Sequence, residues 1–132
     1  MEKVIILAGG LGSRLGIETQ KTPKPMVEIG GIPIIVHIMN IYSYFGYNEF
    51  ILAIGYKSKM IQNYFSKFRA DSNWSIDCID TGLNTQTGGR IKQAMEFAGH
   101  NRVMATYGDG LADINIARLV KFHKNHKKLA TV

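Results

Sequence analysis

Apolar residues recur along this chain with two spacings, and segments of the two kinds alternate. Short apolar runs have the length and β-branched content of strands buried inside a sheet. Between them, apolar residues return every three or four positions, as on one side of a helix. The runs lie at 4–7, 50–54, 74–79, 103–107 and 129–132, and the helical segments lie at 31–45, 57–68, 88–98 and from 115 onwards. Strands that alternate with helices predict a mostly parallel sheet with right-handed crossovers, in a Rossmann-like, three-layer α/β/α fold.

Single residues refine this prediction. Pro33 suits the first turn of the helix at 31–45. Met60 and Leu119 belong to the apolar faces that should turn towards the sheet. Either Asp113 or Asn115 should cap the last helix.

Three glycine-marked stretches each follow a predicted strand. They are Gly9 to Arg14, Gly88-Gly89 and Gly108 to Gly110. Ligands of parallel sheets bind beyond the carboxyl ends of the strands, where the strand order reverses. We therefore expect one edge of the sheet to carry all three stretches.

The first stretch, LAGGLGSRL, is suited to phosphate binding. Glycines without a Cβ atom let backbone N–H groups approach a ligand closely, and Arg14 adds a positive charge. A P-loop would need Gly-Lys-Ser/Thr, and a dinucleotide fingerprint that starts at Gly10 would need glycine where Leu15 stands. Neither pattern is present, and the plain alternative is a tight turn between a strand and a helix.

Two prolines flank Lys24 in the segment from Thr22 to Met26. Each proline ring fixes φ, and Pro25 biases the residue before it away from the helical conformation. The segment is therefore predicted to be extended and stiff. It would hold the Lys24 ammonium at a set place beside the glycine loop.

Composition narrows the class of protein. The chain has 132 residues, 45% hydrophobic and 20% charged, as in an ordinary globular domain. Its net charge of +6 suits an anionic partner. Because no block of five or six like charges occurs, we expect a small anion and no nucleic acid, with a basic nucleic-acid-binding domain as the rival interpretation.

Other features bear on location and metals. Cys78 is the only cysteine, which excludes an internal disulfide and favours a reducing compartment. The N-terminus lacks a signal-peptide pattern, and no apolar stretch reaches the roughly 18 residues of a membrane span. We therefore expect a cytoplasmic protein with no membrane partner. His123 and His126 lie one helical turn apart, but without a third ligand they do not predict a transition-metal site.

Several motifs together resemble one enzyme family. LAGGLGSRL with PKPMVEIGG, DTG at 80–82, TGGR at 87–90 and TYGDGLAD at 106–113 are similar to the signature of the sugar-1-phosphate nucleotidyltransferases. Within that family the glucose-1-phosphate cytidylyltransferases are the most similar, and the similarity continues to Val132. The resemblance implies a nucleotidyltransferase fold. Residues 1–132 would be its nucleotide-binding part, truncated at the C-terminal end, because family members are longer.

The resemblance also implies a reaction and residue roles. A nucleotidyl group would pass from a nucleoside triphosphate, CTP, to a sugar 1-phosphate, glucose 1-phosphate, with release of pyrophosphate. The catalytic residues would be Arg14, on the β- and γ-phosphates, and Lys24, between the α-phosphate and the sugar phosphate. Asp109 would hold the expected cofactor, Mg²⁺, with a second carboxylate from the missing half. The nucleotide would contact two stretches, namely Leu7, Ala8, Gly9, Gly10, Gly12 and Ser13 in the first, and Thr87, Gly88 and Gly89 in the second.

Plain alternatives stay open for these residues. Asp109 could form an Asp-Gly turn, and Thr87 to Gly89 could be an ordinary helix start. Arg90 is as well explained by exposed packing as by ligand contact. For the whole chain the alternative is a nucleotide-binding module without turnover, and a homo-oligomer is compatible with the sequence.

Overall fold

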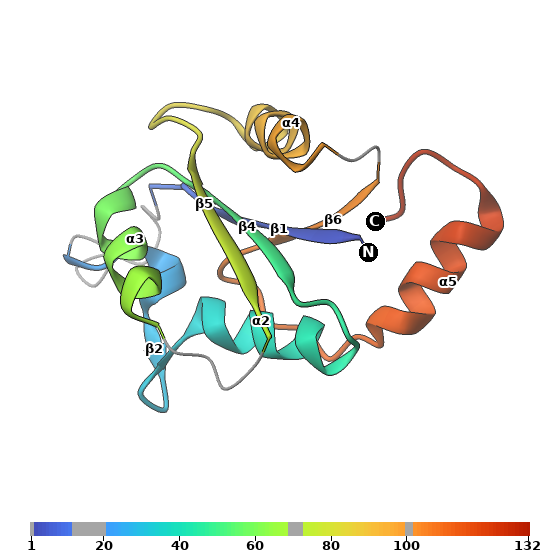
Figure 1. Ribbon diagram of the computed structural model, residues 1–132, viewed down its shortest axis with the longest axis horizontal. Helices are drawn as coiled ribbons and strands as arrows, with labels where there is room; N and C mark the ends of the chain where they lie inside the picture. Colours follow the sequence, from blue (N-terminus) through green and yellow to red (C-terminus); the bar gives the residue numbers. More distant parts are fainter. Residues whose placement is uncertain (1, 12–20, 69–72, 100–101) are drawn as a thin grey trace.

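A parallel sheet forms the middle layer of the molecule (Figure 1). The computed structural model describes residues 2–11, 21–68, 73–99 and 102–132. Within them the sheet has four strands in the spatial order β5-β4-β1-β6, and every neighbouring pair is parallel. The strands are β1 (Lys3–Ala8), β4 (Glu49–Ile54), β5 (Ser75–Asp80) and β6 (Val103–Tyr107). Each of these four strands lies where the apolar runs predicted it.

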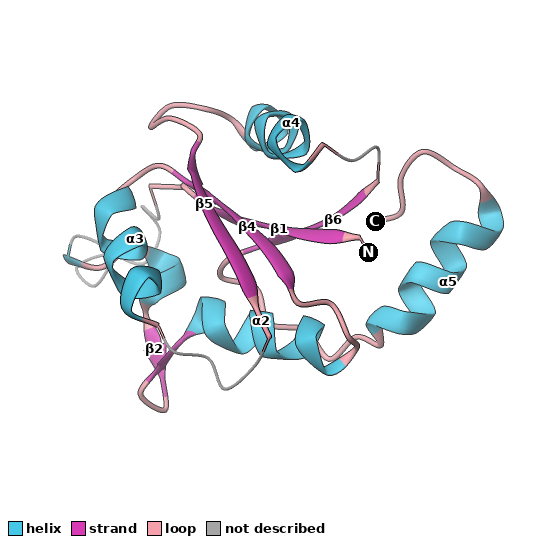
Figure 2. Cartoon of the chain, in the orientation of Figure 1, coloured by secondary structure: helices cyan, strands magenta, loops and turns pink. Residues whose placement is uncertain are grey.

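Helices cover both faces of this sheet, as Figure 2 shows. They are α2 (Ile34–Tyr44), α3 (Ser58–Lys67), α4 (Thr87–Ala98) and α5 (Ile116–His126). Ile5 of β1 is buried in one core cluster with Ala94 and Ala98 of α4. Val4 and Ile6, which point the other way, are buried in the second cluster with residues of α2, α3 and α5. The predicted three-layer α/β/α arrangement is confirmed.

The strand order reverses between β1 and β6. The chain passes from β1 to β4 and on to β5 over the face that α2 and α3 cover, then returns through α4 on the opposite face to pair β6 with the free side of β1. The carboxyl ends of β1 and β6 are therefore neighbours. The Gly108 N–H donates to the Leu7 carbonyl at 2.9 Å, which continues the pairing past the end of β6. Ligands of doubly wound sheets bind at such a reversal point.

A small hairpin precedes α2 and was not predicted. Its strands are β2 (Glu28–Ile29) and β3 (Ile32–Pro33), which pair antiparallel. Gly30 and Gly31 have φ of 61° and 77°, the left-handed values that a two-residue hairpin turn needs. The hairpin uses residues that the apolar pattern had assigned to the helix, so Pro33 is the residue before the first turn of α2 and not part of it.

The strand predicted at 129–132 does not form. Lys127 has φ of 55° and ends α5 in the left-handed conformation. The chain then folds back so that the Thr131 hydroxyl oxygen lies 2.8 Å from His123 Nδ1 and 2.6 Å from His126 Nε2. A strand gains its stability from a neighbouring strand, and here the segment contacts its own helix instead.

Two side chains predicted to face the sheet are exposed. Met60 is 43% exposed and Leu119 is 36% exposed, whereas Ile61 and Ile116 are buried. α3 and α5 lie beside the outer strands of the sheet, so only one row of residues on each reaches the core. Among the described residues, no helix is long and apolar enough to cross a membrane.

The N-terminus of α5 is capped by Asn115. Its Oδ1 accepts a hydrogen bond from the Arg118 N–H at 3.0 Å, which decides between the two candidates that the sequence left open. Asp113 lies exposed in the segment before it.

Removing this cap should destabilise the chain measurably. Asn115→Ala is expected to lower the free energy of unfolding by about 1 kcal/mol, because an N–H of the first turn loses its acceptor. Asp113→Ala is the matched control and should leave the stability nearly unchanged. Urea unfolding followed by circular dichroism measures both, and equal losses in the two variants would contradict the assignment of the cap.

Candidate functional site

Two oppositely charged side chains from distant parts of the chain meet at the reversal point. Lys24 Nζ and Asp109 Oδ2 form an ion pair, and the two side chains are 32% and 27% exposed. Asp109 comes directly after Gly108, which continues the pairing of β6 with β1. A Cβ at Gly108 would lie 3.1 Å from Pro25, so the segment that carries Lys24 packs closely on the end of β6. The structure thus brings together the predicted catalytic lysine and the predicted metal ligand.

The turn that holds Lys24 has a different shape from the predicted one. Lys24–Met26 form a 3₁₀ turn, and only the flanking Pro23 and Val27 are extended. The expectation of a fully extended segment was therefore wrong. Pro25 lies in the first turn, where its missing N–H costs nothing, and Met26 N–H donates to the Pro23 carbonyl at 2.8 Å. Pro25 and Met26 are buried and anchor the turn that carries Lys24.

At Gly9 the absence of a side chain leaves room for another residue of the protein. A Cβ there would lie 2.1 Å from Arg90 Nη1, so the space belongs to a side chain of the protein. The Gly9 carbonyl accepts from Arg90 Nη2 at 3.0 Å and from the Tyr56 N–H at 3.3 Å. Gly10, in contrast, is exposed, and a Cβ there would meet nothing within 4 Å. Of these two glycines, Gly10 is thus the one with open space around it.

The other predicted residues of the first stretch are Leu7 and Ala8 at the end of β1, followed by Gly12, Ser13 and Arg14. Ala8 is buried, and the Leu7 carbonyl is used by the Gly108 N–H. Gly12, Ser13 and Arg14 lie outside the described residues. Leu7 is half-buried, and together with Ala8 it forms the end of β1.

Arg90 is buried in the middle of this region, so the expectation of exposed packing for Arg90 was wrong. It is 5% exposed and donates to four oxygen atoms of the protein. The acceptors are the carbonyls of Ile54, Gly9 and Leu83, at 3.3, 3.0 and 3.2 Å, and Thr81 Oγ1, at 2.7 Å. Burial lowers the pKa of Arg90, and the charge of Asp80 acts in the opposite direction. A buried cation is tolerated only with such a full set of acceptors, and no pattern in the sequence signals that set.

Thr87, Gly88 and Gly89 form the first turn of α4. All three are exposed, and the preceding Gln86 makes no side-chain cap. The N–H groups at a helix N-terminus that lack a cap can bind an external acceptor. The turn follows the loop after β5 and therefore lies on the same edge of the sheet as Gly10 and Asp109, as predicted.

The Asp109 carboxylate is the kind of ligand that a magnesium ion binds. The described residues contain no cluster of three or more His, Cys, Asp or Glu side chains that could hold a metal ion. Mg²⁺ commonly binds through one or two carboxylates, with water and phosphate oxygens completing its shell. The Lys24 ammonium lies against Oδ2, which shows that this carboxylate accepts a cation.

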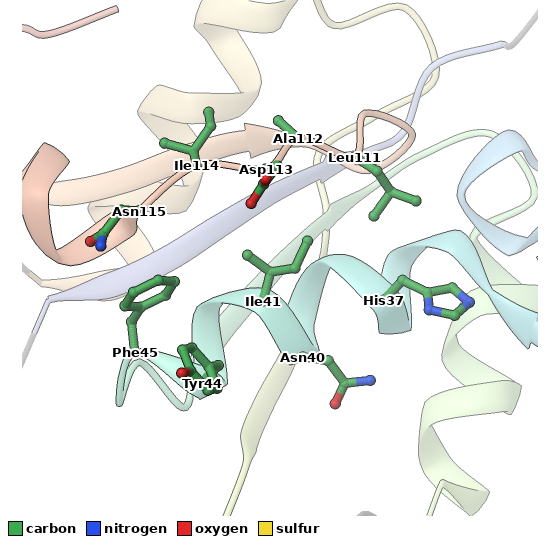
Figure 3. Close-up of a pocket in the computed structure, with 10 residues that line it drawn as sticks. All are labelled: His37, Asn40, Ile41, Tyr44, Phe45, Leu111, Ala112, Asp113, Ile114 and Asn115. Atoms are coloured by element: carbon green, nitrogen blue, oxygen red, sulfur yellow. The ribbon is translucent and has the colours of Figure 1, made fainter.

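A cavity of about 770 Å³ adjoins this region (Figure 3). It lies between α2 and the segment that links Gly110 to α5. Its lining residues are His37, Asn40, Ile41, Tyr44, Phe45, Leu111, Ala112, Asp113, Ile114 and Asn115. The sequence did not predict it, because it is formed where two segments far apart in the chain face each other.

The fold and the site together define a class of protein. A parallel sheet whose order reverses beside a glycine turn, with a lysine and a carboxylate at that point, is the arrangement of a nucleotide-binding α/β domain. Residues 3–132 match the family model described as "Nucleotidyl transferase". The chain belongs to this nucleotidyl transferase family.

The chain is similar in sequence to two glucose-1-phosphate cytidylyltransferases of this family. It is 41% identical over 149 residues to a probable glucose-1-phosphate cytidylyltransferase of Bacillus subtilis, covering 98% of this chain and 59% of that protein. It is also 41% identical, with the same coverage of both chains, to the glucose-1-phosphate cytidylyltransferase of Salmonella typhimurium. The chain thus spans about 59% of the length of these relatives.

A solved structure supports the same family. The structure of HddC from Yersinia pseudotuberculosis complexed with GMP-PN has a TM-score of 0.78 and 30% identity. The match covers 93% of this chain and 54% of that one.

Proposed function

We propose that this chain is the nucleotide-binding part of an enzyme that transfers the cytidylyl group of CTP to glucose 1-phosphate, releasing pyrophosphate. One observation carries the proposal: Lys24 and Asp109 meet at the neighbouring ends of β1 and β6, where Gly10 presents open backbone. The cytidylyltransferases that are 41% identical favour CTP and glucose 1-phosphate as the substrates. A triphosphate substrate and a single cysteine also favour a cytoplasmic location.

This reaction requires neutralisation of the phosphate charge more than it requires a general base. An oxygen of the sugar phosphate attacks the α-phosphorus, a new P–O bond forms, and the bond to the oxygen shared with the β-phosphate breaks. Because the attacking oxygen already carries negative charge, no general base is needed. The protein has to hold the two anions in line and balance their charge.

The residues on this edge would divide that task. Lys24, fixed on its turn by buried neighbours, would lie between the α-phosphate and the sugar phosphate. The Gly10 backbone, with Gly12, Ser13 and Arg14 beyond it, would bind the rest of the triphosphate. Thr87–Gly89 would contact the base through their backbone at the uncapped start of α4.

Magnesium would be held by Asp109. When bound, the ion would neutralise phosphate charge and help align the reacting groups. Lys24 balances the charge of this carboxylate in the structure, and the same ammonium would be available to the phosphates.

A nucleotide-binding module without turnover is the second candidate. It is favoured by the coverage, because the chain spans only part of the relatives' length. Both candidate functions require nucleotide binding, which titration with CTP, GTP, UTP, dTTP and ATP tests. We expect CTP to bind most tightly. Release of pyrophosphate on addition of glucose 1-phosphate then separates the enzyme from the module.

Two outcomes would contradict both candidates. One is the absence of any triphosphate binding. The other is binding to long duplex DNA with a steep salt dependence that free triphosphates do not affect, which would favour the nucleic-acid interpretation.

Arg14 offers a test of the first glycine stretch. Arg14→Ala is expected to weaken CTP binding by about 10-fold to 100-fold, because it removes a charge-assisted hydrogen bond of about 1.5–3 kcal/mol to a phosphate. Isothermal titration calorimetry measures the affinity, and thermal unfolding checks the fold. Arg118→Ala, on the exposed surface of α5, is the control. An unchanged affinity in Arg14→Ala would remove Arg14 from the site.

A further inference from the structure

Arg90 connects two parts of the candidate nucleotide site without facing solvent itself. Nη2 of its guanidinium donates to the carbonyls of Gly9 and Leu83, and Nη1 donates to Thr81 Oγ1. Gly9 belongs to the first glycine stretch. Thr81 and Leu83 belong to the loop that leads from β5 to the first turn of α4.

The surrounding main chain is shaped around this guanidinium. A Cβ at Gly9 would lie 2.1 Å from Arg90 Nη1, and a Cβ at Gly55 would lie 2.6 Å from the same atom. The strand ends of β1 and β4 therefore approach Arg90 at two glycines. The Ile54 carbonyl, at the end of β4, accepts from the guanidinium as well as from the N–H and the hydroxyl of Thr81.

Arg90 lies at the start of α4, so its contacts also affect where this helix begins. It follows Gly89 directly, within the first turn of α4. Whatever fixes the guanidinium relative to Gly9 therefore also fixes the start of α4 relative to the first glycine stretch.

We propose that Arg90 is a positioning residue that sets the distance between the phosphate-binding backbone at Gly9-Gly10 and the base-binding turn at Thr87–Gly89. This inference rests on the proposed function, in which one nucleotide spans both segments. A ligand with two joined parts binds more tightly than either part only while both subsites keep the right separation. Misplacement by about 1 Å can cost about 100-fold where groups must be aligned.

The test compares a whole nucleotide with its parts. In Arg90→Lys the charge remains, but a single ammonium cannot reach the Gly9 carbonyl and Thr81 at once in the way a planar guanidinium does. We expect the Kd of CTP to rise about 10-fold, while the Kd values of pyrophosphate and of cytidine, measured separately, change by less than about 3-fold. Arg118→Lys is the matched control, and all three of its affinities should stay unchanged.

A second variant removes a partner of Arg90 and leaves Arg90 in place. Thr81→Val keeps the volume of this buried side chain and deletes the hydroxyl that lies 2.7 Å from Nη1. The same pattern is expected with a smaller rise in the Kd of CTP. This variant decides the question if Arg90→Lys does not fold, as judged by circular dichroism.

The outcomes separate this inference from the proposed function. If the unchanged chain does not bind CTP, the proposed function fails. If it binds CTP and the folded variants bind CTP as tightly as the unchanged chain does, Arg90 has a structural role only and the inference is overturned. A parallel loss of affinity for CTP, pyrophosphate and cytidine would overturn it too, because that pattern indicates general damage to the site.

Discussion

Replacing Lys24 with methionine is expected to lower the rate of pyrophosphate release by about 100-fold to 1,000-fold. Removal of one preorganised donor that stabilises transition-state charge costs about 3–4 kcal/mol in enzymes. Methionine has a similar length and no charge, and the buried Pro25 and Met26 should keep the turn in place. The Kd of CTP should rise less than the rate falls, since the ammonium acts mainly while charge is transferred.

The ion pair with Asp109 leads to a second expected effect of the same variant, a gain in magnesium affinity. Because the Lys24 ammonium competes with any cation at Asp109 Oδ2, Lys24→Met should bind Mg²⁺ more tightly in the absence of nucleotide. Calorimetric titration with MgCl₂ measures this, and a coupled phosphate assay measures the rate. Lys21→Met changes an exposed lysine of the same segment and should alter neither quantity. If Lys24→Met keeps both the rate and the CTP affinity within about 2-fold, the assignment of Lys24 is wrong.

Asp109→Asn should change the metal dependence far more than the affinity for the nucleotide. The amide keeps the shape of the carboxylate but loses the charge that attracts Mg²⁺, so the Mg²⁺ concentration for half-maximal rate should rise at least about 10-fold. The maximal rate should fall about 100-fold, because the ion stabilises the transition state by several kcal/mol. CTP affinity without metal should be unchanged or higher, since the variant frees Lys24 and removes a negative charge near the phosphates.

Asp113→Asn is the control for this experiment. It changes an exposed carboxylate of the same segment, and its magnesium titration should match that of the unchanged chain. An unchanged magnesium titration in Asp109→Asn would exclude Asp109 as a metal ligand.

The alternating pattern was sufficient to predict the sheet because its strands carry apolar residues at strand spacing, and the two central strands, β1 and β4, are mostly buried. Three of these strands, β1, β4 and β6, end directly before a glycine, and all four lie within one or two residues of the predicted bounds. The predictions failed where neighbours outside the segment decide. Residues 129–132 have strand-like composition, yet a strand needs a paired edge, and the segment contacts α5 instead. Gly30-Gly31 closes a hairpin that the apolar pattern alone did not show.

In the candidate site, too, the sequence predicted one feature and the tertiary structure decided another. The order of motifs along the chain predicted that Lys24 and Asp109 lie on one edge, because parallel strands carry their carboxyl ends together. It did not predict that they form an ion pair, which depends on the 3₁₀ turn and on the close packing of Pro25 against Gly108.

The amino-acid sequence by itself determined the α/β class, the positions of the four strands of the sheet and the family of this chain. Those features depend on local spacing and on short motifs, which can be read one segment at a time. The tertiary structure alone decided the burial of Arg90 and the placement of its guanidinium in the space beside Gly9. Both depend on three segments that meet around one guanidinium, at Gly9, at Ile54 and in the loop from Thr81 to Leu83. A buried charge is stable only where the fold supplies its acceptors.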